Sequence, residues 1–134
     1  MERIIIPRTI ANQLLAQAQA SSQQEICGLI SALDGIPTRC HPVENIASYP
    51  DTQFLLNPET QIRVMNQIRE QGESLFGIYH SHPHSPPIPS KSDTIQAAYP
   101  EAFYFIISLN IKGVLEMRCF KFQQGAYREL ELEL

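Results

Sequence analysis

The sequence predicts an α/β protein in which a mixed β-sheet is flanked by helices. Short apolar runs, typical of strands, alternate along the 134 residues with three segments whose apolar residues recur at helical spacing. The segment AFYFIISL at 102–109 is almost entirely apolar, as expected of a central strand buried on both faces. The length is typical of one domain, so we expect a single domain over residues 1–134.

The first third of the chain predicts a strand, a helix and a hairpin. RIIIP is a short strand candidate that Pro7 ends, and an amphipathic helix should follow over residues 8–20. Its apolar side is formed by Ile10, Leu14, Leu15 and Ala18. ICGLISAL at 26–33 is an apolar run closed by a DG turn signal, and IPTRCHPVEN at 36–45 should return as its partner strand.

The middle of the chain predicts a short strand, a helix and a longer strand. TQFLLN at 52–57 is the short strand candidate. PETQIRVMNQIREQG at 58–72 begins with proline and ends with glycine, which is typical of helix boundaries. We expect Ile62, Met65 and Ile68 on its apolar side. SLFGIYHSH at 74–82 follows as a strand and ends at a proline-rich loop.

The C-terminal part predicts a short helix followed by strands. SKSDTIQAAY at 90–99 is the third helix candidate, and the buried strand at 102–109 follows it. The segments at 114–122 and 126–134 alternate between apolar and polar residues and are separated by QQG, so we expect a hairpin near an edge of the sheet. That edge could pair with a second copy, which leaves a homodimer open.

Composition excludes several kinds of partner and compartment. The net charge is −4 and no dense run of Lys and Arg exists, so nucleic acid is not an expected partner. No signal-peptide core is present and no run approaches the ~20 apolar residues of a membrane span. The three cysteines form no CxxC pair, which indicates neither a thiolate metal site nor a disulfide framework. We therefore expect a soluble cytoplasmic protein.

Two histidines and one aspartate have the spacing of a metal site. If residues 74–82 form a strand, His80 and His82 point to the same face, ~7 Å apart along it. Asp93 lies eleven residues after His82, in the first turn of the expected third helix. Four prolines restrict the intervening loop, which lowers the entropy lost when the loop presents a ligand. Two imidazoles and one carboxylate would leave the fourth position of a tetrahedral Zn²⁺ open for water, as a catalytic site requires.

Simpler interpretations exist for the same residues. Ser90 and Asp93 have the spacing of a helix capping box, and Ser92 is an alternative cap. A single histidine on a strand is more often structural than a ligand. The capping interpretation and the site interpretation are compatible for Ser90, because a cap residue can also line a site.

The motifs together resemble the signature of the JAMM, or MPN-plus, metalloproteases, E…H-S/T-H-x7-S-x2-D. EICGLI at 25–30 supplies the glutamate, and HSHP, the seven residues Pro83–Pro89 and SKSD supply the rest. The resemblance implies one Zn²⁺ per chain bound by His80, His82 and Asp93. It also implies that Glu25 acts as the general base and later protonates the leaving amine, and that Ser90 stabilises the oxyanion.

The resemblance further implies a compact prokaryotic member of the family. Only 41 residues follow Asp93, so no long substrate-gripping insertion fits there. Such members are similar to peptidases that act on ubiquitin-like sulfur carrier proteins. They hydrolyse the amide bond after the C-terminal Gly-Gly, and release an amino acid such as cysteine or trim the tail. Whether the bond is a peptide or an isopeptide bond stays open.

Three other kinds of domain share part of this pattern. A RadC-like domain has a related motif, but with Asn where this chain has Ser81. A zinc nucleoside deaminase would share the layered α/β fold, and the expected architecture is cytidine-deaminase-like in that sense, but H-x-E and P-C-x-x-C are absent. A non-catalytic MPN-type binding domain would lack ligands that this chain keeps.

Several neighbouring residues are expected outside the chemistry. We expect His84 to be an exposed loop residue and His41 to be incidental. Ser81 should point away from the metal face and bond to backbone, and Cys27 should be a small buried residue. Tyr79 and Tyr99 are expected in the core.

Overall fold

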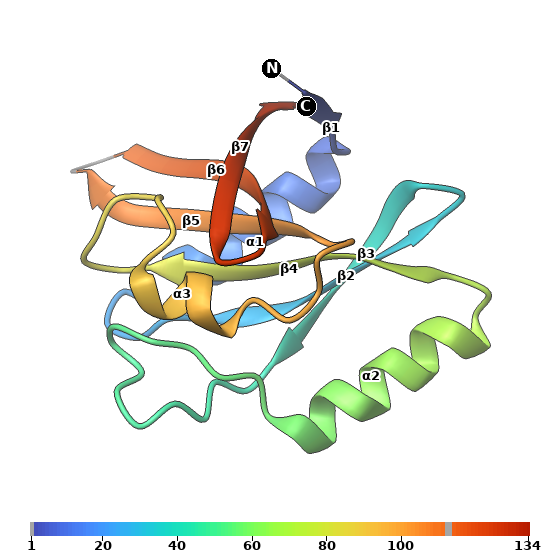
Figure 1. Ribbon diagram of the computed structural model, residues 1–134, viewed down its shortest axis with the longest axis horizontal. Helices are drawn as coiled ribbons and strands as arrows, with labels where there is room; N and C mark the ends of the chain where they lie inside the picture. Colours follow the sequence, from blue (N-terminus) through green and yellow to red (C-terminus); the bar gives the residue numbers. More distant parts are fainter. Residues whose placement is uncertain (1, 112–113) are drawn as a thin grey trace.

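The computed structural model describes residues 2–111 and 114–134 as one sheet with helices on both faces (Figure 1). Its strands are β1 (Arg3–Ile5), β2 (Cys27–Leu33), β3 (Ile36–Val43), β4 (Ser74–His82), β5 (Phe103–Ile111), β6 (Val114–Gln123) and β7 (Ala126–Glu133). Its helices are α1 (Arg8–Gln19), α2 (Pro58–Glu70) and α3 (Lys91–Gln96). The strand order is β1-β7-β6-β5-β4-β2-β3. The pairs β1–β7 and β4–β5 are parallel and the others antiparallel, so the predicted mixed sheet is confirmed.

The N-terminal elements follow the sequence pattern. The carbonyl of Pro7 accepts hydrogen bonds from the N–H groups of Ile10 and Ala11, which starts α1 directly after the proline. The buried side of α1 consists of Ile10, Ala11, Leu14 and Ala18. The β2–β3 hairpin turns at Asp34 and Gly35, which have φ values of 52° and 80°. Two consecutive positive φ angles are typical of a type I′ turn, which explains the Asp-Gly signal.

One prediction about the middle of the chain is wrong, and another is wrong at a single residue. The segment 52–57 forms no strand, and only Leu56 makes an isolated bridge, to Asn45. On α2, Ile68 is buried and Met65 packs half-buried against the same apolar cluster, as predicted, but Ile62 is 63% exposed. The buried residues of α2 are Thr60, Val64 and Ile68. These are four residues apart and share one side of the helix, whereas Ile62 lies about 200° from Thr60.

The predicted C-terminal hairpin near a sheet edge is confirmed, and a further strand, β1, lies outside it. β1 pairs with the last residues of β7 in parallel, from Arg3–Glu131 to Ile5–Glu133, so β1 is the edge. The two chain termini consequently lie side by side (Figure 1). β7 therefore pairs with β6 through residues 126–130 and with β1 through residues 131–133.

The sheet separates two apolar clusters, and the site belongs to one of them. α1 packs on the face that carries Tyr79, Phe105 and Leu130. α2 packs on the opposite face, where Ile78 and Ile106 lie. Because strand side chains alternate, the residues of β4 that follow Ile78 on this face are its two histidines. No helix in the described part of the chain has the length and apolar character needed to cross a membrane.

Candidate active site

The end of β4 brings the two histidines together, as the spacing predicts. β4 lies inside the sheet between β2 and β5, so His80 and His82 are both buried. Their Nε2 atoms are 3.1 Å apart. Nδ1 of His82 lies 2.8 Å from the carbonyl oxygen of Pro86, which can only accept a hydrogen bond. Nδ1 therefore carries the proton, and Nε2 of His82 is left with a free electron pair.

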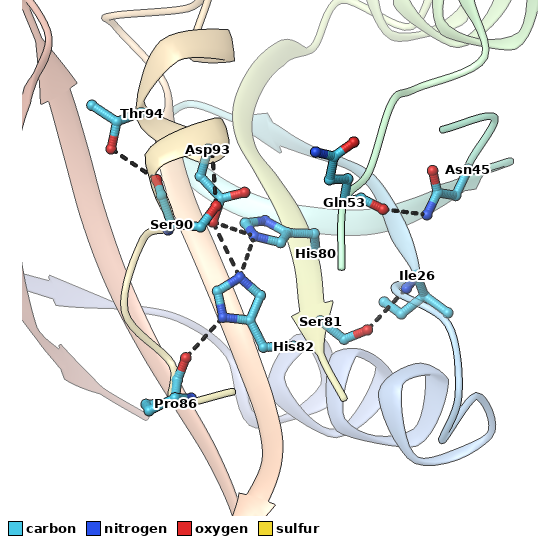
Figure 2. Close-up of polar contacts among 10 residues, drawn as sticks. All are labelled: Ile26, Asn45, Gln53, His80, Ser81, His82, Pro86, Ser90, Asp93 and Thr94. Carbon is cyan, nitrogen blue, oxygen red and sulfur yellow. Dashed lines mark hydrogen bonds and ion pairs between the residues drawn. The ribbon is translucent and has the colours of Figure 1, made fainter. Parts of the chain in front are cut away.

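The proline loop returns Asp93 to the same point (Figure 2). Oδ2 of Asp93 lies 3.1 Å from Nε2 of both His80 and His82. The loop is anchored to the sheet by Ser108, whose hydroxyl donates to the carbonyl of Ser85 at 2.7 Å. Three potential ligand atoms thus converge from β4 and α3.

Ser90 caps α3 and contacts the same carboxylate. Its Oγ accepts a hydrogen bond from the N–H of Asp93 at 3.0 Å, and its own N–H donates to Asp93 Oδ2 at 2.9 Å. The capping box is therefore present, with Ser90 rather than Ser92 as the cap. This bond uses the Ser90 oxygen as an acceptor and leaves the hydroxyl proton available for another partner.

Glu25 lies two residues before β2, with its side chain beside the two histidines. It is only 4% exposed, and a carboxylate oxygen lies within 4.8 Å of the ligand atoms of His80 and His82. Oε1 has no hydrogen-bond partner among the described residues. An isolated glutamate beside a strand is usually solvated, so this burial without a partner is a sign of function rather than of surface charge.

The surroundings shift the pKa values of the two carboxylates in opposite directions. Burial raises the pKa of Glu25 to about 8. Burial also disfavours the charged form of Asp93, but the charge and hydrogen bonds of the histidines and the Ser90 N–H outweigh it and hold its pKa below the usual range. Burial lowers the pKa of His80. For His82 the contacts with Asp93 and Pro86 outweigh burial and raise the pKa. Asp93 thus stays ionised, whereas the Glu25 carboxyl can hold a proton near neutral pH.

Two overlapping triads of side chains could hold a metal ion. The ligand atoms of His80, His82 and Asp93 lie 3.1 Å from one another, and the triad with Glu25 in place of Asp93 has its ligand atoms within 4.8 Å of one another. Ligands about 2.0–2.1 Å from a tetrahedral zinc ion lie about 3.3 Å from one another. The spacing of the first triad matches this value, and Glu25 lies close beside it with an oxygen, Oε1, that has no hydrogen-bond partner among the described residues.

The loop between β3 and α2, residues 44–57, holds the other side of the site. Phe54 from this β3–α2 loop stacks on the ring of His80, with centroids 4.2 Å apart. The Nδ2 group of Asn45 donates to the carbonyl of Glu25 at 3.0 Å. Sequence reasoning missed both residues, because an irregular loop gives no periodicity and neither residue belongs to the motif.

Ser81 joins the strand of the histidines to the segment of Glu25. It lies on the opposite face of β4, and its Oγ accepts a hydrogen bond from the N–H of Ile26 at 2.9 Å (Figure 2). Its own N–H donates to the carbonyl of Ile26 at 3.0 Å. The predicted bond from Ser81 to backbone is therefore confirmed.

The remaining candidates lie outside the cluster. His84 is exposed, and the Nε2 atom of His41 contacts the hydroxyl of Ser31 at 2.9 Å. Cys27 is buried, and its thiol donates to the carbonyl of Val43. Tyr79 and Tyr99 pack against the apolar clusters, Tyr99 only half-buried.

The chain is similar to a known protein family and to individual characterised proteins. A family model described as prokaryotic homologs of the JAB domain matches residues 7–122. A desampylase from Haloferax volcanii is 36% identical over 86 residues, which are 63% of this chain and 62% of the relative, so the match spans less than two thirds of that protein. A CysO-cysteine peptidase from Mycobacterium tuberculosis is 28% identical over 128 residues, 94% of this chain and 87% of the relative.

A solved structure shares the fold over nearly the whole chain. The solution structure of a protein from Desulfitobacterium hafniense superposes with a TM-score of 0.83 at 28% identity. The superposition covers 96% of this chain and 90% of the other. The strand order and the helix positions described above are therefore those of an existing protein fold.

Proposed function

The chain belongs to the family of prokaryotic homologs of the JAB domain, and we propose that it is a zinc-dependent peptidase. The observation that carries the proposal is the convergence of His80, His82 and Asp93 at 3.1 Å with the buried carboxylate of Glu25 behind them. In this assignment the first three residues bind one Zn²⁺ and Glu25 does not. A bound zinc ion would lower the pKa of water to about 7 and polarise the carbonyl of the bond to be cleaved.

Glu25 is proposed as the group that moves the proton. A pKa of about 8 lets its carboxylate take a proton from the attacking water near neutral pH and return it to the leaving amine. Ser90 is proposed as the donor to the developing oxyanion, because its hydroxyl proton is not used in capping α3. Asp93 remains an anion throughout, which suits a ligand and not a proton carrier.

The proposed substrate is the C-terminal tail of a ubiquitin-like sulfur carrier protein. The names of the desampylase and the CysO-cysteine peptidase support this class of substrate. The amide bond cleaved would follow the terminal Gly-Gly, with release of an attached amino acid such as cysteine or trimming of the tail. A tail of two glycines lacks side chains, so it can lie extended in a narrow groove close to the metal.

The proposal is tested with the zinc-loaded protein and two carriers. One carrier bears cysteine in peptide linkage to its terminal glycine, and the other is joined to the side-chain amine of lysine. Mass spectrometry should show release of at least one leaving group, and the pair distinguishes a peptide from an isopeptide substrate. His82→Ala should abolish release, whereas His84→Ala, an exposed histidine two residues away, should leave it unchanged.

An inactive zinc-loaded protein that binds the carrier would support the non-catalytic alternative instead. Cleavage that survives His82→Ala would refute the site. The homodimer and the cytoplasmic location stay predictions, which light scattering and cell fractionation would test.

A further inference from the structure

Asn45 is the second residue of the β3–α2 loop, and its side-chain amide uses every hydrogen-bonding position that it has. Nδ2 donates to the carbonyls of Glu25 and Gln53, both at 3.0 Å (Figure 2 shows the second). Oδ1 accepts from the N–H groups of Ala47 and Leu55, also both at 3.0 Å. A carboxamide has two donor hydrogens and two acceptor lone pairs, so this side chain is saturated.

The loop that Asn45 organises also holds the backbone of Glu25. The N–H of Glu25 donates to the carbonyl of Pro50 at 2.7 Å, and its C=O accepts from Asn45. Both backbone groups of Glu25 are therefore bonded to the β3–α2 loop instead of to the sheet. The position of its carboxylate depends on a loop that has no regular structure of its own.

The loop is closed at its base by two backbone hydrogen bonds, which flank the antiparallel bridge between Asn45 and Leu56. Ile46 N–H donates to the carbonyl of Leu55 at 2.9 Å, and Asn57 N–H donates to the carbonyl of Glu44 at 3.0 Å. Asn45 lies between Glu44 and Ile46, whose backbone groups make these two bonds. Its side-chain amide connects both strands of the loop base to the segment that carries Glu25. Without it, two carbonyls and two N–H groups in the same place would need other partners.

No other side chain of this size can make the same four bonds. Aspartate has the same shape but only acceptors, so its carboxylate would face the carbonyl oxygens of Glu25 and Gln53 and repel them. Leucine has the same size and offers neither donors nor acceptors. The requirement is for an amide and not simply for a polar residue.

We propose that Asn45 is a positioning residue of the site, which clamps the β3–α2 loop to the backbone of Glu25 and thereby fixes the carboxylate beside His80 and His82. The inference rests on the proposed function where it concerns rate, because it assumes that Glu25 moves the proton. It assigns no contact between Asn45 and substrate or metal. Displacement of a reacting group by about 1 Å can cost about 100-fold in rate, so a loosened clamp should act on turnover.

The test compares Asn45→Asp with Asn57→Asp, which makes the same chemical change in the same loop. Asn57 caps α2 by accepting the N–H of Glu59, a bond that aspartate also makes, so this control should behave as wild type. In the zinc-loaded protein, Asn45→Asp should lower kcat about 10–100-fold and change KM less than about threefold. Zinc content should stay at that of wild type, because Asn45 touches none of the three proposed ligands.

Amide hydrogen exchange supplies a readout that needs no substrate. In Asn45→Asp the N–H groups of Glu25, Ala47 and Leu55 should exchange at least about tenfold faster than in wild type, while those of β4 should not change. Asn57→Asp should leave all of them unchanged. If Asn45→Asp does not fold, Asn45→Ser, whose hydroxyl keeps one donor and one acceptor, should show the same effects at smaller size.

Two results would overturn the inference. The first is unchanged exchange at Glu25 in Asn45→Asp, because the clamp would then not hold that residue. The second is a fall in kcat that matches the loss of folded protein, because Asn45 would then be structural only. A wild-type protein that cleaves no carrier refutes the proposed function instead, and the clamp is then judged by exchange alone.

Discussion

Replacing Glu25 by glutamine should stabilise the metal-free protein at neutral pH, although it removes the proposed base. The Glu25 carboxyl is 4% exposed, and burial raises its pKa from an ordinary 4.5 to about 8. Between these values the folded chain binds this proton more tightly than the unfolded chain does. Stability from this group is therefore fully present below pH 4.5 and is lost as the pH rises towards 8.

The size of the effect follows from the same two values. Each pH unit in this interval costs about 1.4 kcal/mol. At pH 7 the loss relative to pH 4.5 is therefore about 3 kcal/mol, a large part of the stability of a small domain. Glutamine has the same shape and no charge, so Glu25→Gln should lack this loss. Its buried amide can add a constant cost, and the change with pH is therefore the quantity to measure.

Urea unfolding of chelator-treated protein at pH 5, 6, 7 and 8 measures this difference. The free energy of unfolding of Glu25→Gln minus that of wild type should rise by about 3 kcal/mol from pH 5 to pH 8. Glu70→Gln, which changes an exposed carboxylate of α2, should show no such trend. A constant difference between Glu25→Gln and wild type across this range would refute the burial and the electrostatic reasoning behind the proposed base.

Four further substitutions test the packing in and around the site. Phe54→Ala removes the ring stacked on His80 and should weaken zinc affinity about 10-fold in a competition titration, and an unchanged affinity would show that the ring plays no part in holding the ligand. Val64→Ala should destabilise the protein by about 1–3 kcal/mol in urea unfolding, whereas Ile62→Ala should cost less than about 0.5 kcal/mol; the reverse order would contradict the buried side of α2. Gly28→Ala should lower the free energy of unfolding by about 1–3 kcal/mol, because the added methyl group would collide with the buried side chain of Tyr79 on β4. Wild-type stability of this variant would show that Tyr79 moves aside without cost.

Those parts of the fold that are determined by local sequence patterns could be predicted from the sequence. The β2–β3 hairpin follows from an Asp-Gly pair whose two left-handed positions few other residues accept. The proposed metal ligands were accessible for a similar reason. His80 and His82 alternate on one strand, and Asp93 follows within a short stiff loop, so their meeting needs only a strand, a turn and a helix start.

The features that the sequence did not indicate depend on contacts between residues far apart in the chain. β1 and β7 lie at opposite ends of the chain, and no local pattern states that the first strand covers the last. In α2, Ile62 is apolar but lies on the exposed side, because the register against the sheet is fixed by Val64 and Ile68. Asn45 belongs to the same group, since its four partners matter only once the loop has closed.

The measurement that tests the central claim most directly is zinc content and cleavage in one preparation of each variant. Glu25→Gln should keep about one zinc per chain and lose carrier cleavage by at least about 1000-fold, because it removes a proton carrier and not a ligand. Asp93→Asn, which keeps the side-chain shape and weakens the proposed ligand, should lose both zinc and cleavage. Loss of zinc in Glu25→Gln, with full zinc in Asp93→Asn, would contradict the division of roles between the two carboxylates.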